Sequence, residues 1–117
     1  MQNLEPQVFL QAVETILSAK KIFIHAKSAS ASMGQLLFFR LRRLGLPVAQ
    51  IPPGGTEMME GLAQAGEDDV VLFFGFSKVS WEGKVILDCR KTAGYKTICF
   101  TSRLLAPREE QADINLY

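Results

Sequence analysis

The chain has 117 residues, of which 48% are hydrophobic, 9% aromatic and 21% charged. These proportions exclude a disordered or fibrous chain, and the length leaves room for a single domain with one core. Thirteen Lys and Arg against twelve Asp and Glu give a formal charge of +1, so there is no basic excess that would hold nucleic acid.

The termini and the cysteines indicate where such a protein works. The N-terminus lacks the basic start and the continuous apolar stretch of a secretory signal, and no later run approaches a membrane span. Cys89 and Cys99 have no Cys-x-x-Cys spacing, which favours free buried thiols over a disulfide or a zinc site. We expect a cytoplasmic protein with no metal, cofactor or membrane contact. Its abrupt start and apolar end indicate that residues 1–117 form one domain excised from a longer chain.

The first half of the chain alternates helical and extended patterns. Apolar residues spaced by three and four predict an amphipathic helix over 6–20, and a branched and aromatic run predicts a strand over 21–26. A loop of small residues over 27–32 leads to a strong helix from about Ser32 to Leu44, which Gly45 closes.

The alternation continues in the middle of the chain. A second strand is predicted over 48–51, and after a Pro-Pro-Gly-Gly turn Thr56 is positioned to cap a helix that ends near Gly66. Residues 70–74 are continuously apolar, as expected for a central parallel strand that is covered on both faces.

The last third predicts a polar turn over 77–80, a helix over 81–93 and a strand over 97–100. A helical turn after Pro107 and a final strand over 113–117 complete the pattern. Strands that alternate with helices specify an α/β fold, a three-layer sandwich around an open five-stranded parallel sheet. We expect the flavodoxin-like strand order 2-1-3-4-5.

This topology predicts a binding site before any motif is considered. Ligands of such sheets bind at the carboxyl ends of the strands where the strand order reverses, here between the first and third strands. The loops that leave those strands, 27–32 and 77–80, combine serines with a lysine at the entry to a helix. Hydroxyls, helix-start amides and a lysine suit a phosphate group. The same serines are also good helix caps, and loop lysines are often only solvated.

Three stretches carry a resemblance to a known family. They are Ile16-Leu17-Ser18-Ala19-Lys20-Lys21-Ile22-Phe23-Ile24, Phe39-Arg40-Leu41-Arg42-Arg43-Leu44-Gly45-Leu46-Pro47-Val48, and Ala112-Asp113-Ile114. With the two loops, they resemble the sugar isomerase (SIS) domain, especially the C-terminal domain of RpiR/MurR-type transcription regulators. The resemblance covers nearly the whole chain and implies a five-stranded parallel sheet between helices.

Many members of this family bind phosphosugars through a Gly-x-Gly-x-Ser loop and a Ser-x-Ser-Gly-x-Thr loop. In the first loop Ser30 matches the serine, while Ala26 and Ser28 replace the glycines. In the second loop Gly75 replaces the first serine and Lys78 replaces the glycine; Ser77 and Ser80 match the second serine and the threonine. The ligand-binding residues that we expect are Ser28, Ser30, Ser77, Lys78 and Ser80, with Thr101 and Ser102 as further possibilities.

The resemblance implies a non-catalytic effector-sensing and dimerisation domain of a bacterial transcription regulator, with a phosphorylated sugar or a related anion as effector. DNA contact would belong to a missing N-terminal helix-turn-helix domain, not to this fragment. The arginines at 40, 42 and 43 more often form solvated or interfacial ion pairs. Apolar residues cover most of the predicted helix 32–44, which favours a homodimer through the first two helices over full burial within the monomer.

Two alternatives belong to other classes. One is an aldose-ketose phosphosugar isomerase, which needs a general base near the sugar. The single histidine, His25, lies late in a strand, where a buried structural role is favoured. Near helix starts or on helices a solvated or dipole-favoured carboxylate is favoured, and this applies to Glu57, Glu60 and Glu82. No catalytic residue is therefore assigned. The other alternative is a structural dimer module with a degenerate pocket.

Overall fold

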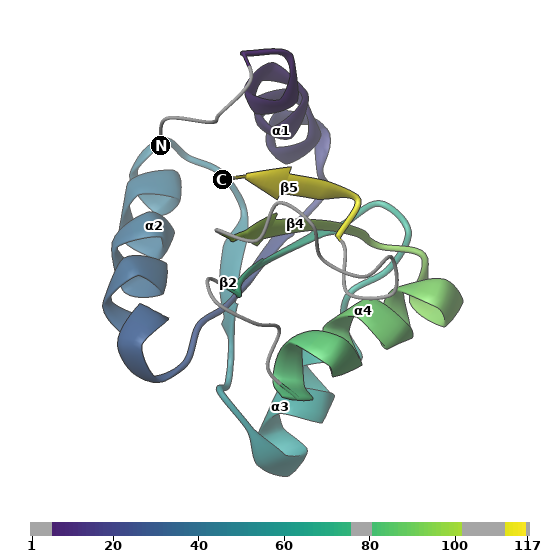
Figure 1. The fold of residues 1–117 in the computed structure, drawn as a ribbon. Helices are drawn as coiled ribbons and strands as arrows, with labels where there is room; N and C mark the ends of the chain where they lie inside the picture. Colours follow the sequence, from purple (N-terminus) through teal and green to yellow (C-terminus); the bar gives the residue numbers. More distant parts are fainter. Residues whose placement is uncertain (1–5, 76–80, 102–111, 117) are drawn as a thin grey trace.

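The protein is a three-layer α/β sandwich around a five-stranded parallel sheet with the order β2-β1-β3-β4-β5 (Figure 1). The structure, a computed structural model, describes residues 6–75, 81–101 and 112–116. The elements are α1 (Pro6–Ser18), β1 (Ile22–His25), the 3₁₀ turn η1 (Ser28–Ser30), α2 (Ala31–Arg43), β2 (Val48–Ile51), α3 (Gly55–Leu62), β3 (Val70–Phe74), α4 (Trp81–Ala93), β4 (Lys96–Phe100) and β5 (Ile114–Leu116). The predicted fold class and strand order are confirmed.

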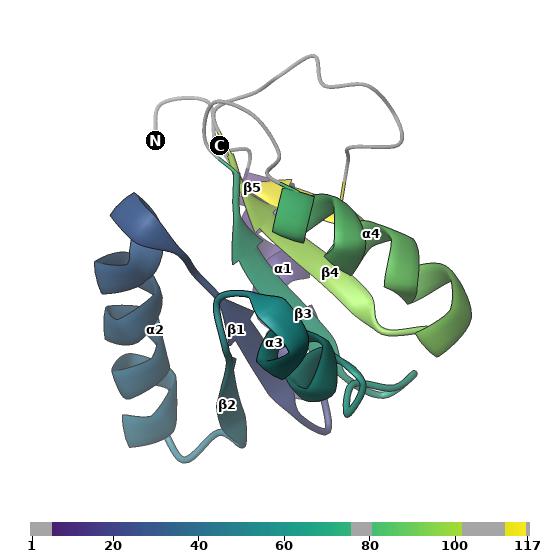
Figure 2. The same ribbon diagram turned by 90° about the horizontal axis from the view of Figure 1, so that it is seen from below.

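Each face of the sheet has its own core. Ile24 and Leu72 belong to the cluster beneath α1 and α2, whereas Phe23 and Val71 belong to the cluster beneath α3 and α4. Viewed from below, α3 and α4 lie in front of the strands and α1 lies behind them (Figure 2). Strand β3 supplies buried residues to both clusters, which is why its sequence is continuously apolar instead of alternating.

The predicted bounds of β2, β3 and α4 agree with the structure, and most other elements differ by one or two residues. The prediction for the third helix was wrong at both ends. The chain turns at Gly55, which has a positive φ of 67°, so the helix begins before Thr56 and its N-cap is Gly54. It ends at Leu62, and beyond Ala63 the N–H groups of Gln64 and Ala65 bond to carbonyls only three residues back, as in a turn. The helical turn predicted after Pro107 lies outside the described residues.

The edge strand β5 is tied to the sheet by a polar cluster. The Asp113 carboxylate accepts hydrogen bonds from the backbone N–H and the hydroxyl of Thr97, at 2.8 and 2.9 Å. The Asp113 N–H and Arg90 each donate to the Thr97 hydroxyl at 3.0 Å. These bonds join β4, β5 and α4, which gives a structural reason for the Ala112-Asp113-Ile114 stretch.

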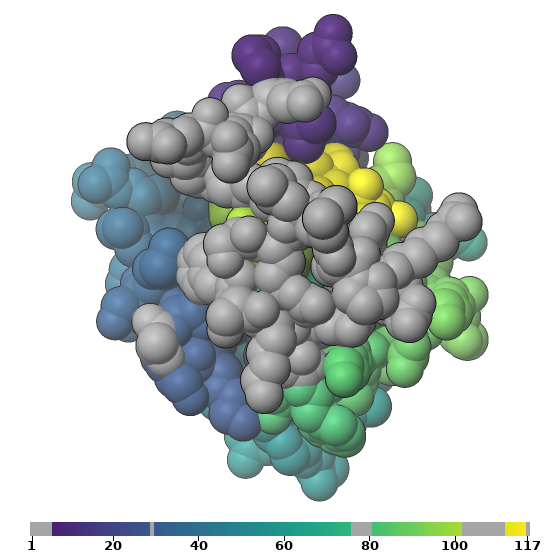
Figure 3. Space-filling view, viewed as in Figure 1, coloured from purple at the N-terminus to yellow at the C-terminus, as the bar shows by residue number. Residues whose placement is uncertain are grey.

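Figure 3 shows the four α-helices at the rim of the space-filling surface, with α1 at the top, α2 at the left, α3 at the bottom and α4 at the right. In the described ranges, no helix combines the length and the apolar character that crossing a bilayer requires.

Candidate functional site

The loop that follows β1 meets the start of α4, the helix that follows β3, at the carboxyl edge of the sheet. Lys27 stands two residues after β1, and Glu82 stands in the first turn of α4, the helix that follows β3. Their side chains form an ion pair with 2.7 Å between Lys27 Nζ and Glu82 Oε2. Because β1 and β3 are adjacent parallel strands, this pair spans the place where the strand order reverses.

Ser28 has a backbone conformation that residues other than glycine rarely adopt. Its φ is +56°, and it is the one described residue other than glycine with a positive φ. The left-handed region costs such a residue about 1–2 kcal/mol. Strained residues cluster at functional sites, and Ser28 presents an exposed side chain at the candidate site.

The hydroxyl of Ser30 closes the same turn. It donates to the Lys27 carbonyl at 3.0 Å and accepts from the Lys27 N–H at 3.3 Å. Ser30 is also the N-cap residue of α2, although its side chain makes no capping bond to that helix. The hydroxyl therefore orders the loop around Lys27 in this structure.

The first loop lies unusually close to α2. A Cβ placed on Gly34 of α2 would lie 2.4 Å from the Cβ of Ala26, closer than two such atoms can approach. Glycine at position 34 thus makes room for the alanine that follows β1, and it sets the distance between α2 and the start of the loop.

His25, the last residue of β1, is buried beside this loop. It is 4% exposed, and its Nε2 donates to the Pro53 carbonyl at 3.1 Å. Burial lowers the pKa of His25 below the ordinary 6.5, although the bond to Pro53 and the nearby Glu82 carboxylate act in the opposite direction. The buried structural role that we predicted for His25 agrees with this geometry, and the histidine also lies near the ion pair.

The ion pair leaves Glu82 ionised. The hydrogen bond from Lys27 lowers the pKa of the Glu82 carboxyl, and the backbone N–H of Glu82 acts in the same direction. The Glu82 side chain is 13% exposed and the Lys27 side chain 49%. Of the two expectations for Glu82, a solvated or a dipole-favoured carboxylate, the place of Glu82 in the first turn of α4 agrees with the second, and the structure adds the bond to Lys27.

A hollow of about 420 Å³ lies beside the loop, at the carboxyl ends of β1 and β2. Its lining includes Ala26, Gly34, Gln50 and Pro53. It adjoins the first loop and is bounded by the start of α2, so a ligand at the loop has room for uncharged polar groups on this side.

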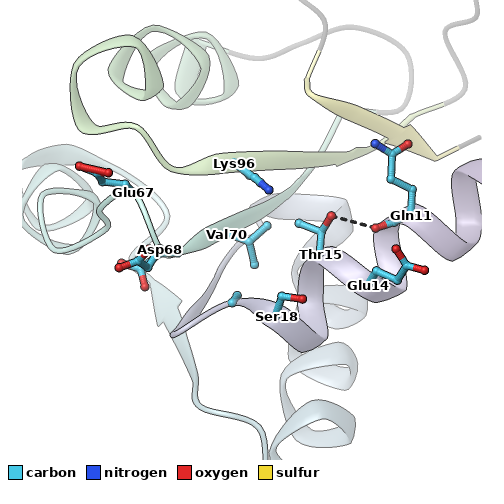
Figure 4. A pocket seen from close by; sticks show the side chains of 10 residues that line it. Gln11, Glu14, Thr15, Ser18, Glu67, Asp68, Val70 and Lys96 are labelled. Atoms are coloured by element: carbon cyan, nitrogen blue, oxygen red, sulfur yellow. Dashed lines mark hydrogen bonds between the residues drawn. The ribbon is translucent and has the colours of Figure 1, made fainter.

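A second hollow of about 390 Å³ lies at the opposite edge of the sheet (Figure 4). Val70 and Lys96, the first residues of β3 and β4, lie between α1 and the turn that carries Glu67 and Asp68. Glu14 of α1 adds another carboxylate to the lining. The excess of acidic groups does not suit an anion, and the position is remote from the switch point.

Some of the predicted site residues lie within the described part of the chain and others do not. Ser28 and Ser30 lie in η1, beside the Lys27–Glu82 pair. Thr101 is described and buried. The other predicted positions, Ser77, Lys78, Ser80 and Ser102, lie outside the described residues.

Sequence reasoning missed Glu82 as a site residue. The available signal was its place in the first turn of the helix after β3, but the residue that it contacts is 55 positions away in the sequence. In the part of the chain that the structure describes, no group of three His, Cys, Asp or Glu side chains is arranged to hold a metal ion.

Comparison with known proteins identifies the family. The SIS domain family matches residues 15–117. The chain belongs to the SIS domain family. A search of curated protein sequences found no match.

Solved SIS structures share the fold at low sequence identity. The sugar isomerase domain of an RpiR transcription factor from Sphaerobacter thermophilus has a TM-score of 0.88 and 22% identity, over 98% of this chain and 64% of that one. The Vibrio vulnificus NanR protein complexed with ManNAc-6P has a TM-score of 0.82 and 15% identity, over 98% of this chain and 43% of that one. A Methanococcus jannaschii protein with an inferred 3-hexulose-6-phosphate isomerase function has a TM-score of 0.69 and 21% identity, over 94% of this chain and 58% of that one. This SIS chain thus spans less than two thirds of each structure.

Two residues of the first loop of this SIS domain depart from the glycine-containing loop that the resemblance implied. Ser28 replaces the second glycine, yet its positive φ is the conformation that glycine adopts most readily. Ala26 replaces the first glycine, and the adjacent Gly34 leaves space for its methyl group. The two substitutions are therefore accommodated within the SIS fold.

Proposed function

We propose that this SIS domain is the non-catalytic effector-sensing domain of a bacterial transcription regulator and that it binds a phosphorylated sugar or a related anion. The observation that carries the proposal is the meeting of the β1 loop with the start of α4 at the switch point. Similar folds include an RpiR transcription factor and a NanR protein that was solved with ManNAc-6P. In this proposal residues 1–117 are one domain of a longer regulator, whose helix-turn-helix domain contacts the DNA.

The ligand in this proposal is held by the two serine-containing loops. Ser28 offers an exposed hydroxyl, and its turn precedes the first N–H groups of α2. Ser30 contributes through the order that its hydroxyl gives to the turn. Ser77, Lys78 and Ser80 are proposed to complete the site from the other loop, where hydroxyls and an ammonium group suit a phosphate.

A homodimer through α1 and α2 is the second part of the proposal. It is supported by exposed apolar side chains on and next to the helix 31–43, where Leu36, Phe39 and Leu44 at its end are 57%, 54% and 74% exposed. Exposed apolar side chains also lie on α1, at Phe9, Leu10 and Leu17. Both helices cover the same face of the sheet (Figure 1). A two-fold axis through that face would bury both sets at once.

Charge supports the same pairing. Helix α1 carries Glu14 and no basic residue, whereas α2 carries Arg40, Arg42 and Arg43 and no acidic residue. A groove of about 710 Å³ runs along α2 over Phe74 and Phe100, with Arg40 and Arg43 in its lining. Contact between α1 of one copy and α2 of the other would therefore join opposite charges around an apolar centre.

A phosphosugar isomerase is the second candidate, because the carboxylate of Glu82 lies close enough to His25 to affect its pKa. Aldose-ketose isomerisation needs a base beside the sugar, and a carboxylate at the switch point is one. The backbone bond of His25 to Pro53 and the bond of Glu82 to Lys27 favour the non-catalytic reading, because neither group is free in this arrangement.

Thermal-shift screening against phosphorylated sugars, repeated with Ser77→Ala and Ser80→Ala, tests the binding site. We expect at least one ligand to raise the melting temperature of the natural protein and to lose its effect in both variants. A protein that no phosphorylated sugar stabilises would contradict the proposal and favour a structural dimer module with a degenerate pocket.

Product analysis by NMR separates the sensor from the isomerase. The protein is incubated with a panel of aldose and ketose phosphates, and the spectra are followed for interconversion. The proposal predicts that none of the pairs interconverts faster than it does without protein. Interconversion that disappears in Glu82→Gln would establish the isomerase instead.

A further inference from the structure

The cation nearest the candidate anion site already has an anionic partner within the chain. Lys27 lies two residues after β1, in the same loop as Ser28 and Ser30, and its ammonium group lies 2.7 Å from the Glu82 carboxylate. An ammonium group in that place can serve as the counter-charge for a bound phosphate. Here its charge is balanced by an internal carboxylate.

Glu82 is positioned to compete with an external anion in two ways. Its carboxylate holds Lys27, and it also lies in the first turn of α4, where the free N–H groups and the helix dipole attract negative charge. Its own backbone N–H stabilises the ionised carboxylate, as does Lys27. One side chain therefore engages Lys27 and also draws on the positive end of α4.

We propose that Glu82 is a specificity-determining residue that competes with the anionic group of the ligand for Lys27. This inference rests on the proposed anion site and concerns how that site is regulated. A ligand that binds must transfer Lys27 from Glu82 to its own phosphate, so that weakly charged anions, which cannot compete with Glu82, are rejected. The ion pair and the bound anion are mutually exclusive in this scheme.

The exposure of the pair sets the expected size of the effect. Lys27 is about half exposed whereas Glu82 is mostly covered. Partly exposed ion pairs contribute at most about 1 kcal/mol, which corresponds to roughly fivefold in affinity. Loss of the Glu82 charge also removes its repulsion of a bound phosphate, which raises the affinity further. We expect a several-fold gain in anion affinity when Glu82 loses its charge.

The test compares calorimetric affinities for inorganic phosphate and for ManNAc-6P in the natural protein, Glu82→Gln, Lys27→Met and the double variant. Glu57→Gln is the matched control, since Glu57 is the acidic residue in the first turn of α3 and is exposed. Circular dichroism checks that each variant is folded. We expect Glu82→Gln to bind phosphate several-fold more tightly, Lys27→Met to bind more weakly, and Glu57→Gln to match the natural protein.

The double variant shows whether Glu82 acts through Lys27. If Glu82 and the bound anion compete for the Lys27 ammonium group, the gain in anion affinity from Glu82→Gln should largely disappear in the double variant with Lys27→Met. Weaker or unchanged binding in Glu82→Gln would overturn the inference, and weaker binding would assign Glu82 to ligand contact instead. If the natural protein binds an anion but Glu82→Gln gains nothing, the anion site stands and only the competition fails. Absence of binding in every variant would overturn both.

Discussion

At the scale of single residues, Ser28 connects backbone strain to the candidate site. Its positive φ lies where glycine is favoured, and the serine retains that conformation while adding an exposed hydroxyl. Glycine would adopt this backbone conformation at a lower energetic cost than serine does. The strain is consistent with a hydroxyl that serves the ligand more than the fold.

Substitutions at Ser28 should separate the backbone requirement from the hydroxyl. We expect Ser28→Gly to keep its stability within about 0.5 kcal/mol, because relief of strain offsets the greater freedom of glycine in the unfolded chain. Ser28→Val should lose roughly 1–2 kcal/mol, since branched side chains resist this conformation. Urea unfolding measures both values. Equal stability of the two variants would contradict the assigned strain.

His25 should make stability fall in mild acid. Its pKa in the folded state is lowered by burial, so the unfolded chain binds a proton first as the pH falls below 6.5. Because the unfolded state then holds more protons, the free energy of unfolding decreases, by up to about 1.4 kcal/mol per pH unit while the folded histidine stays neutral. Above that pH the effect is absent.

The pH dependence can be assigned because His25 is the single histidine of the chain. Urea unfolding is measured from neutral pH into mild acid for the natural protein and for His25→Gln, whose amide retains a donor for the Pro53 carbonyl. We expect the variant to have the flatter profile. Identical slopes in the two proteins would show that other groups cause the acid sensitivity.

At the scale of secondary structure elements, the contact between α2 and the end of β1 fixes the geometry of the first loop. The sequence predicted both elements, but it did not predict that the helix would lie so close to the strand end that only glycine fits at position 34. A Cβ there would meet the Cβ of Ala26, whose position is set by the buried strand that precedes it. Helix position and loop position are therefore linked.

Gly34→Ala tests this link. We expect a loss of roughly 1–3 kcal/mol in the free energy of unfolding, because the added methyl group overpacks the contact by more than the gain in helix propensity returns. Ala26→Gly in the same chain should restore most of the loss by removing the opposing methyl group. The control is the single variant Ala26→Gly. A double variant no more stable than Gly34→Ala would show that the two residues do not interfere.

At the scale of the whole molecule, the exposed apolar residues are distributed unevenly. The face that carries α1 and α2 exposes several large apolar side chains on both helices, whereas on the opposite face α3 exposes Met59 at 41% and α4 exposes Trp81 at 66%. Groups of this kind on one face are typical of an interaction surface. In the proposed regulator, such a surface would let a ligand at the carboxyl edge bias the arrangement of two subunits.

The proposed homodimer is tested by sedimentation velocity over a range of protein concentrations. We expect the natural protein to dimerise, and Leu36→Glu or Leu44→Glu to shift it to monomer, because a buried carboxylate without a partner opposes association. Met59→Glu is the matched control, as an exposed apolar residue on the opposite face. Leu36 of α2 and Leu44, the residue that caps its C-terminus, are both exposed, so the variants should stay folded. A natural protein that is monomeric at every concentration, or a dimer that is unaffected by the α2 changes, would contradict the proposal.

The sequence determined the order of elements, the parallel sheet and the edge at which the loops gather, because those follow from apolar periodicity and the handedness of chain connections. The tertiary structure decided what lies within the site: Glu82 pairs with a lysine 55 positions away, and Ser28 has a left-handed backbone. Periodicity records which face of an element is buried. It carries no information about which two polar side chains from distant loops will meet, because that depends on the relative placement of elements after the core has packed.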